Sequence, residues 1–306
     1  MIYSIAIPVR DGAATLPRLL EALSQQRTQA SVEIVAVDSG SRDGSVEILR
    51  AAKAEVFEIP PEEFGHGRTR NLLLSKTRGE IVFLFSQDAV PLDERYLDSL
   101  ATPILTSKQV AGAYAKQIPG ASAHPLERLR WRRSPAGGNV PFLSEIPSPG
   151  NFEKLPPERK RRLCEFHSAA CAIRRSAWEK ISFPDVPIGE DVAWARAALL
   201  ARYSLAFEPG AVVEHSHHRP LDEEQRRIRA EAALEWRLFG YAPVVSALGV
   251  VGHTLLRGAG DALAVLGGEG TFPQKISALP RAAAFAWARS LGYYQGYRDA
   301  LSRRAP

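Results

Sequence analysis

Carboxylates at two places in this chain have the residue types and surroundings that chemistry on a diphosphate requires. Asp88 closely follows the uninterrupted apolar run 81–85, so we expect it where a buried strand meets solvent. Glu190 and Asp191 come at the predicted start of a helix. A carboxylate after a strand can share a divalent cation with phosphate oxygens, and one at a helix start can take a proton from a hydroxyl. Each has a structural alternative: a turn before Pro91 for Asp88, and helix capping for the acidic pair.

The segment His-Ser-His-His at 215–218 is a third candidate. In an extended segment His215 and His217 lie on the same face, and imidazole suits Mn²⁺ better than Mg²⁺. Either histidine could complete a site begun by Asp88, and a solvated histidine-rich turn is the alternative. The sequence therefore predicts a divalent cation, Mn²⁺ or Mg²⁺, that neutralises charge on a departing nucleoside diphosphate.

Alternating strands and helices are expected to position these residues. The pattern predicts strands at 3–9, 33–37, 55–59 and 80–85, and helices that begin near residues 15, 45 and 67. Buried strands separated by helices are typical of an α/β fold with a mostly parallel sheet covered on both faces. Ligands of such sheets bind beyond the carboxyl ends of the strands. Asp38 is expected there, where it could accept a pyrimidine N–H or ribose hydroxyls. Its alternative, shared with Asp43, is to cap the next helix.

The second half of the chain is expected to differ. The Pro-, Gly- and Ser-rich stretch 119–157 predicts a mobile or substrate-covering loop. Regular structure is expected to resume at 168–174, followed by helices near 178 and up to residue 201, and by strands near 205 and 212. Beyond residue 220 the pattern is helical, at 221–239, 241–266 and 275–301.

This change of pattern divides the chain into a catalytic domain at 1–220 and a helical extension at 221–306. The extension could cap the catalytic domain, form a homo-oligomer interface, or attach peripherally to a membrane through residues such as Trp287. The apolar stretch 244–266 contains His253, Arg257 and Asp261, so it is not expected to cross a bilayer.

Composition restricts the partners. The 306 residues carry a net charge of +5, with a sequence pI of about 9.3, which favours anionic partners such as nucleotide diphosphates or lipid phosphates. No zinc finger, RNA-binding strand signature or long basic helix supports nucleic acid. Two cysteines without a CxxC motif argue against a disulfide framework and indicate a reduced, cytoplasmic setting. The first residues turn polar quickly, which predicts a buried strand rather than a signal peptide.

Seven segments resemble the family 2 glycosyltransferases, the inverting enzymes of GT-A fold, in their residues and in their order. They are IAIPVRDG, VAVDSGSRDGS, FGHGRTRN, FLFSQDAVP, FHSAACAIRRSAWEKISFP, GED and VVEHSH. The similarity covers roughly residues 3 to 220 and is closest to bacterial rhamnosyltransferase-like members. Each segment is short, but the ordered set is specific.

The resemblance implies two groups of donor-binding residues. The residues that would line the base pocket are Pro8, Val9, Arg10 and Asp38. The residues that would approach the nucleotide and sugar diphosphate are His66, Gly67, Arg70 and Asn71, with Gln87 counted among them.

The resemblance also implies catalytic and metal-binding roles. Asp191 matches the catalytic base, and Glu190 beside it would contact the acceptor or the donor sugar. Asp88 matches the metal-binding aspartate of a DxD-like motif, and His215 or His217 matches a further metal ligand. The chain departs from the full motif because Ala89 and Val90 follow Asp88 where a second aspartate would stand, which shifts metal dependence towards histidine.

We therefore expect a cytoplasmic enzyme, with peripheral attachment at the inner membrane face as an option. It would move a sugar, rhamnose in the first instance, from a dTDP-, UDP- or GDP-linked donor to a hydroxyl of a glycan or lipid-linked acceptor. Two alternatives belong to other classes. A sugar-nucleotide pyrophosphorylase would need a glycine-rich phosphate loop after the first strand, where 11–14 offers one glycine. A non-catalytic nucleotide- or glycan-binding protein of the same fold would be expected to lack Asp88 or Asp191.

Overall fold

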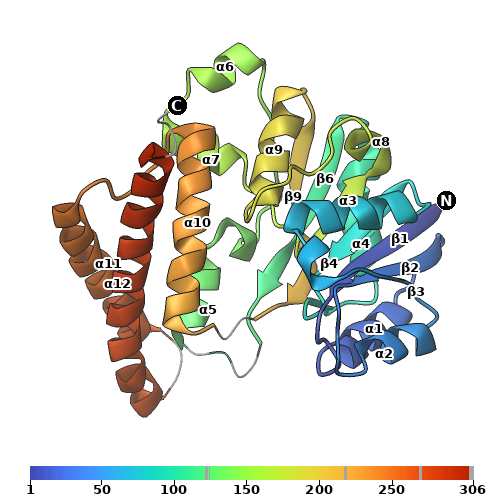
Figure 1. The fold of residues 1–306 in the computed structure, drawn as a ribbon, viewed down its shortest axis with the longest axis horizontal. Helices are drawn as coiled ribbons and strands as arrows, with labels where there is room; N and C mark the ends of the chain where they lie inside the picture. The colour runs from blue at the N-terminus through green and yellow to red at the C-terminus, as the bar shows by residue number, and fades with distance from the viewer. Residues whose placement is uncertain (121–122, 124, 217–218, 269–270, 303–306) are drawn as a thin grey trace. The chain divides into compact units, whose positions relative to one another are not determined.

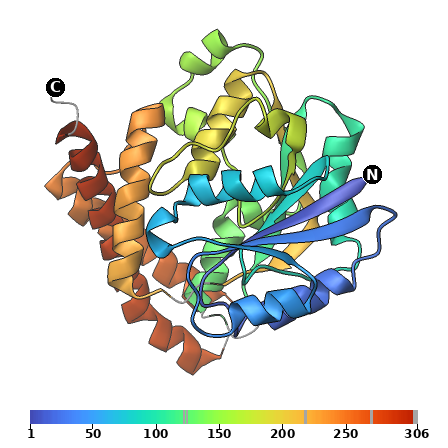
Figure 2. The ribbon, with the colours of Figure 1, turned by 45° about the vertical axis from the view of Figure 1, so that its right-hand side comes forward.

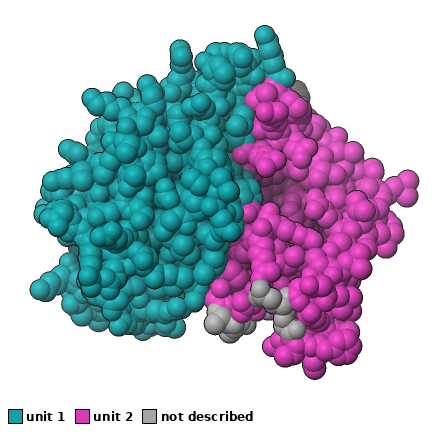
Figure 3. All heavy atoms as spheres, turned by 180° about the vertical axis from the view of Figure 1, so that it is seen from behind, with its two compact units in different colours: residues 1–118, 135–154, 163–216 teal, residues 119–134, 155–162, 217–306 magenta. Residues whose placement is uncertain are grey.

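The computed structural model describes residues 1–120, 123, 125–216, 219–268 and 271–302. Contacts divide the chain into two compact units, coloured teal and magenta in Figure 3. Unit 1 comprises residues 1–118, 135–154 and 163–216, and unit 2 comprises residues 119–134, 155–162 and 217–306. The helical unit 2 thus includes residues 119–134 and 155–162, which a division of the chain at residue 220 would assign to the catalytic domain.

The described residues of unit 1 form a nine-stranded sheet (Figure 1). Its parallel part, in the spatial order β3-β2-β1-β4, consists of β1 (Ile2–Val9), β2 (Ser31–Asp38), β3 (Glu55–Glu58) and β4 (Ile81–Phe85). The strand β8 (Ala170–Arg174) runs antiparallel between β4 and β6 (Val110–Ile118). The strand β9 (Ser204–Glu214) pairs in parallel with β6, and the short strands β5 (Val90–Pro91) and β7 (Phe142–Ser144) pair antiparallel with β9.

The α/β class and the helical C-terminal extension are confirmed, but the sheet is more mixed than we expected. The antiparallel pairings of β8, β5 and β7 lie in the half of the sheet beyond β4, which contains β8, β6, β9, β5 and β7. Apolar runs indicate that a strand is buried but not which way it runs, so this difference could not be read from the pattern. In place of the two strands expected near 205 and 212, one strand, β9, continues through an irregularity in its register with β6.

Helices cover both faces of the parallel part. Tyr3, Ile5 and Ile7 of β1 share a core with α1 (Leu16–Ser24) and α4 (Tyr96–Thr106). On the other face, α3 (His66–Lys76) packs against β1 and β2 with Leu73 and Leu74 buried. Figure 2 shows α3 on one side of these strands, and α1 with α2 (Ser45–Ala51) on the other. Successive side chains of a strand point to opposite faces, so a strand that is apolar on both faces is covered twice.

The prediction that 119–157 is a loop is wrong. This stretch contains the helices α5 (Pro125–Arg133) and α6 (Pro149–Glu153) as well as β7. Leu126 of α5 enters the core of unit 2, and β7 adds to the edge of β9. Two of the prolines that suggested a loop, Pro125 and Pro149, begin α5 and α6, where proline is tolerated because its missing N–H has no partner there in any case.

Three shorter helices lie between residues 157 and 200. Three long helices make up most of unit 2. The short ones are α7 (Pro157–Leu163), α8 (Arg175–Trp178) and α9 (Glu190–Leu200). The long ones are α10 (Leu221–Phe239), α11 (Ala247–Gly267) and α12 (Phe272–Ser302). Ile228, Val265 and Phe285 are among the residues of their common core.

In the part of the chain that the structure describes, no helix is both long enough and apolar enough to cross a membrane.

Candidate active site

The acidic pair Glu190 and Asp191 opens α9, directly after Gly189. Gly189 has a φ of +78°, a left-handed conformation that glycine adopts without strain. Glu190 is buried, and its Oε1 lies 3.0 Å from Nη1 of Arg70 on α3. Asp191 is partly exposed. The pair therefore divides into one carboxylate held in an internal ion pair and one that a substrate could reach.

Ser168 holds both carboxylates. Its hydroxyl donates to Glu190 Oε1 at 3.0 Å, and its hydroxyl and backbone N–H lie 3.3 and 3.2 Å from Asp191 Oδ2. The other oxygen of Asp191 accepts from the backbone N–H of Val192 at 2.8 Å. These bonds fix the orientation of Asp191. Because the bonding partners are neutral, they do not cancel the negative charge of the carboxylate. Ser168 lies within one of the segments that carried the family resemblance, but we assigned it no role from the sequence.

The start of β8 connects this pair with the end of β4. Phe85 of β4 pairs with Ala170 of β8, and the N–H of Ser86 donates to the carbonyl of Ala169 at 2.8 Å. Ser168 therefore lies one residue from a direct partner of Ser86, and Asp88 follows Ser86 by two residues. The antiparallel placement of β8 brings the two predicted acidic positions to the same end of the sheet.

Asp88 and His215 meet at this end. Val90 of β5, two residues after Asp88, pairs with Glu214 of β9, the residue before His215. As a result, Asp88 Oδ1 lies 3.4 Å from His215 Nε2. Gln117 on β6 fixes the imidazole, because its Oε1 lies 2.8 Å from His215 Nδ1 and both side chains are buried. An amide oxygen only accepts, so Nδ1 carries the proton and Nε2 faces Asp88.

This geometry fits two ligands of one divalent cation. Two ligand atoms bonded at roughly 2.1 Å and at right angles lie about 3 Å apart, close to the separation of Asp88 Oδ1 and His215 Nε2. The proton on Nδ1 leaves Nε2 with the lone pair that a metal needs. Among the described residues no group of three or more His, Cys, Asp and Glu side chains could hold a metal ion. The remaining ligands would come from phosphate oxygens and water. His217, the alternative ligand, lies outside the described residues.

Asp38 shapes its own loop. The carboxylate is buried at the end of β2, and its Oδ1 accepts from the backbone N–H groups of Gly40 and Ser41, both at 2.9 Å. The Ser41 hydroxyl donates to the other oxygen. Capping of the next helix falls instead to Asp43, which accepts from the N–H of Ser45, the first residue of α2, at 3.1 Å.

Gln87 clamps the backbone beyond β1. Its Oε1 accepts from the N–H of Arg10 at 2.9 Å, and its Nε2 donates to the carbonyl of Arg10 at 3.0 Å. The side chain of Val9 belongs to the hydrophobic core, while Pro8 lies on the opposite face of the strand, partly exposed. The predicted base-pocket residues thus come together at the ends of β1 and β2, and Gln87 connects them with the segment that carries Asp88.

The predicted site residues of α3 make different contacts. Arg70 is buried against Glu190, and His66 begins the helix with its ring 5.2 Å from that of Phe64. Asn71 uses its whole amide: Oδ1 accepts from Trp178 Nε1 and from the N–H of Phe183, both at 2.9 Å, and Nδ2 donates to the carbonyl of Phe183 at 2.8 Å.

Gly67 lies against the same segment as Asn71. A Cβ at position 67 would lie 2.1 Å from the carbonyl oxygen of Pro184. Gly67 and Asn71 therefore hold α3 against the segment that leads into α9.

The charges of the site also act on Cys171, a buried residue of β8. Burial raises the pKa of its thiol, the carboxylates of Asp191 and Glu190 raise it further, and Arg70 opposes them. The thiol is therefore neutral near pH 7 and is a poor nucleophile.

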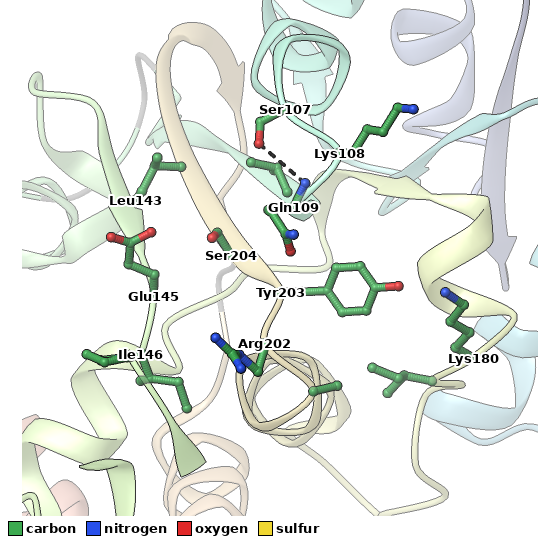
Figure 4. A pocket seen from close by; sticks show the side chains of 14 residues that line it. Ser107, Lys108, Gln109, Leu143, Glu145, Ile146, Lys180, Arg202, Tyr203 and Ser204 are labelled. Atoms are coloured by element: carbon green, nitrogen blue, oxygen red, sulfur yellow. Dashed lines mark hydrogen bonds between the residues drawn. The ribbon is translucent and has the colours of Figure 1, made fainter. Parts of the chain in front are cut away.

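A cavity of about 1120 Å³ opens elsewhere in unit 1, beside the first residues of β6 and β9. Figure 4 shows Lys108, Lys180, Arg202 and Tyr203 around it. None of the predicted site residues lines this cavity. Size alone therefore does not locate the candidate active site, which we identify from the side chains that gather at the carboxyl ends of the parallel strands.

Comparison with known proteins relates the chain to a family of transferases. The family described as Glycosyl transferase family 2 matches residues 4–182. The O-antigen chain rhamnosyltransferase RfbN of Salmonella typhimurium is 30% identical over 231 residues, which cover 74% of this chain and 70% of RfbN. The O-antigen chain rhamnosyltransferase WbaN of Salmonella anatum is 28% identical over 229 residues, which cover 73% and 69% of the two chains.

Solved structures share the fold at lower identity. The mannosyltransferase PcManGT from Pyrobaculum calidifontis, in complex with GDP-Man and Mn²⁺, superposes with a TM-score of 0.58 at 17% identity, over 99% of this chain and 87% of that one. Glucosyl-3-phosphoglycerate synthase from Mycobacterium tuberculosis, in complex with Mn²⁺, UDP and glucosyl-3-phosphoglycerate, gives 0.54 at 18% identity, over 80% and 82%. At these identities the likeness concerns the fold alone.

Proposed function

The chain belongs to glycosyltransferase family 2, and on that basis we propose that it moves a sugar from a nucleoside-diphosphate donor to a hydroxyl of a glycan or lipid-linked acceptor with inversion. The observation that carries the proposal is the pairing of two sites at one end of the sheet. Asp191, partly exposed and oriented by Ser168, supplies a base. Asp88 and His215, 3.4 Å apart, supply a place for the donor's diphosphate and its cation.

The proposed reaction is a single displacement at the anomeric carbon. Asp191 takes the proton of the acceptor hydroxyl while the acceptor oxygen forms a bond to that carbon. The bond from the anomeric carbon to the diphosphate oxygen breaks, and its electron pair leaves with the nucleoside diphosphate. A divalent cation bound by Asp88 and His215 would supply positive charge to the leaving diphosphate. One base is sufficient, because the attacking and leaving groups lie on opposite faces of the sugar.

Glu190 has a different role in this proposal. Its ion pair with Arg70 is buried, so it holds α9 and α3 in register rather than accepting the acceptor's proton. A buried charge pair of this kind is destabilising when one partner is removed. Glu190 would then reach the donor or acceptor sugar only through the free edge of its carboxylate.

Rhamnose is the sugar we favour, and dTDP-rhamnose is the first donor to test. Support comes from two relatives named as O-antigen chain rhamnosyltransferases, each matched over about three quarters of this chain. GDP-Man and UDP occur in complexes of the structural neighbours, so GDP- and UDP-linked donors belong in the same test. The acceptor would be a surface-glycan precursor, and a lipid-linked precursor would place the reaction at the cytoplasmic face of the membrane.

The base assignment is tested by replacing Asp191 with Asn. We expect Asp191→Asn to lower kcat by about 10²- to 10⁴-fold, because the variant has no group to take the acceptor's proton, while donor affinity is retained. Transfer is measured with labelled donor, and the anomeric configuration of the product is read by NMR.

Asp185→Asn is a matched control on the segment that leads into α9. Asp185 forms an exposed ion pair with Arg68 at 3.3 Å, so its loss should leave kcat close to the wild-type value. Transfer by Asp191→Asn at a rate near that of the control would rule out Asp191 as the base. A product with retained configuration would rule out the single displacement.

A further inference from the structure

The helix α11 buries Val250 and Val265 but exposes four leucines. Leu248, Leu255, Leu256 and Leu263 are 85%, 68%, 74% and 71% exposed. At 3.6 residues per turn these leucines share one side of the helix with Val251 and Leu266, which are also exposed. We call these six residues the outer apolar face of α11.

Two polar side chains of α11, those of His253 and Asp261, are paired with other helices of unit 2. His253 Nδ1 lies 2.8 Å from the hydroxyl of Ser290 on α12, and Asp261 Oδ1 lies 2.6 Å from Arg133 Nη1 on α5. A surface helix of a water-soluble protein has the opposite arrangement, with charged residues towards solvent and leucines towards the core. A contiguous exposed apolar face of this kind marks a surface for interaction with a protein or a membrane.

Exposed apolar residues continue along the hairpin that α11 forms with α12. Phe272 and Ile276, in the first turns of α12, are 73% and 44% exposed. The two helices pack on each other, and Gly258 of α11 lies close to Ala286 of α12. In Figure 1 they run side by side over most of their length. The exposed apolar surface therefore extends along α11 and into the first turns of α12.

The charge of the chain is concentrated on the same unit. Unit 2 carries 20 Lys and Arg against 10 Asp and Glu, whereas unit 1 carries 19 against 24. Arg257 of α11 and Arg281 of α12 are among the exposed cations of this unit. A second copy of the chain would bring two strongly positive units together, which like-charge repulsion opposes. An anionic surface would be attracted instead.

We propose that the outer apolar face of α11 docks on an anionic phospholipid bilayer and lies in its interface. Helices with leucines on one side and cationic surroundings insert their apolar side at the boundary between headgroups and acyl chains. Each Lys or Arg near an anionic surface adds attraction that falls with ionic strength. The proposal deepens the proposed function, because a membrane-bound transferase meets a lipid-linked acceptor in two dimensions.

Vesicle co-sedimentation of the full chain tests this proposal. The probes are vesicles of phosphatidylglycerol with phosphatidylethanolamine, and vesicles of phosphatidylcholine alone. We expect the wild-type chain to bind the anionic vesicles, to bind phosphatidylcholine at least about tenfold more weakly, and to lose affinity in high salt. The double variant Leu255→Gln/Leu263→Gln should bind anionic vesicles at least about tenfold more weakly than the wild type.

Leu105→Gln is the matched control. Leu105 is an exposed leucine of α4 in unit 1, so its replacement should leave vesicle binding unchanged. All three substitutions are at exposed positions, and thermal unfolding confirms that each variant is folded. Wild-type binding by the double variant, or no binding of anionic vesicles by the wild type, would contradict the proposal. A wild-type dimer in light scattering that the double variant dissociates would assign the face to a second copy instead.

The same samples separate this proposal from the proposed function. Donor-induced thermal stabilisation is measured without vesicles, and both variants should match the wild type. Absence of stabilisation by any nucleotide would contradict the proposed function and leave the vesicle result standing.

Discussion

Neutral side chains orient the two groups of the candidate site that would carry out the chemistry. Ser168 binds Asp191, and Gln117 binds His215. A hydroxyl or an amide fixes the direction of a catalytic group without cancelling its charge or occupying its reactive atom. The only buried ion pair described at the site is that of Arg70 with Glu190, and Glu190 is the carboxylate that we do not propose as the base. In this proposal Glu190 is the carboxylate with a structural role, and Asp191 is the carboxylate that acts as the base.

Gln117 is expected to set the metal affinity through His215. In Gln117→Leu the imidazole loses the acceptor that fixes its tautomer, and Mn²⁺ affinity should fall about 10- to 100-fold. Gln117→Glu keeps an acceptor at this position and should retain more of the affinity. Mn²⁺ titration followed by electron paramagnetic resonance gives both values.

Gln109→Leu is the control for this prediction, because Gln109 is exposed just before β6, at its opposite end. Equal Mn²⁺ affinity in Gln117→Leu and Gln109→Leu would mean that Gln117 does not position a ligand.

At the scale of elements, α3 braces the segment that leads into α9. Arg70, Asn71 and Gly67 all contact residues between Trp178 and Glu190. Since α9 begins with the acidic pair, any movement of this segment moves Asp191. The family resemblance assigns Gly67 and Asn71 to donor binding, and their contacts in the structure give both residues a packing role as well.

Gly67→Ala tests this brace. The added methyl group would clash with the carbonyl of Pro184, so we expect a loss of about 1–3 kcal/mol in the free energy of unfolding and a lower transfer rate. Gly252→Ala in α11 is the control, because a Cβ there meets nothing within 4 Å. Alanine favours the helix over glycine, so the control should be neutral or stabilised by up to about 1 kcal/mol. Denaturant unfolding of both variants is the measurement, and equal stabilities would contradict a tight contact at Gly67.

The elements that could be predicted from the sequence are those with a clear apolar run or period of their own. The strands β1, β2 and β4 and the helices α1, α3, α10 and α12 lie within a few residues of the expected positions. We did not predict α4 and β6 from the pattern. The loop prediction for 119–157 failed because proline and glycine also occur at helix starts and between short elements. Hydrophobic periodicity describes one segment at a time, whereas the order and direction of the strands depend on pairing between segments far apart in the sequence.

The same limit applies to the candidate site. Asp88, Asp191 and His215 could be singled out because each lies in one of the ordered segments that resemble the family, although an acidic residue at a helix start is by itself usually a cap. Ser168 and Gln117 could not, because a serine or a glutamine gives no signal until its partner is known. The partners lie far along the chain, 23 residues for Ser168 with Asp191 and 98 for Gln117 with His215.

For the whole molecule, the uneven charge distribution supports a role for metal. The unit that carries the candidate site has more acidic than basic residues, although the chain as a whole is basic. A diphosphate would approach that unit against its net charge, so local positive charge has to compensate. Arg70 is already paired with Glu190, and in the proposed function a divalent cation at the Asp88–His215 site would supply such charge.

The most direct test of the account measures the thermal stability of the wild type and of Asp88→Asn with dTDP, UDP, GDP and their sugars, each with and without Mn²⁺. We predict that one base stabilises the wild type only with Mn²⁺, by about 2.7 kcal/mol at a ligand concentration of about 100 times Kd, and that Asp88→Asn loses the effect. Stabilisation that is the same with and without Mn²⁺, or absent with every nucleotide, would contradict the claim that this site binds a metal–nucleotide donor.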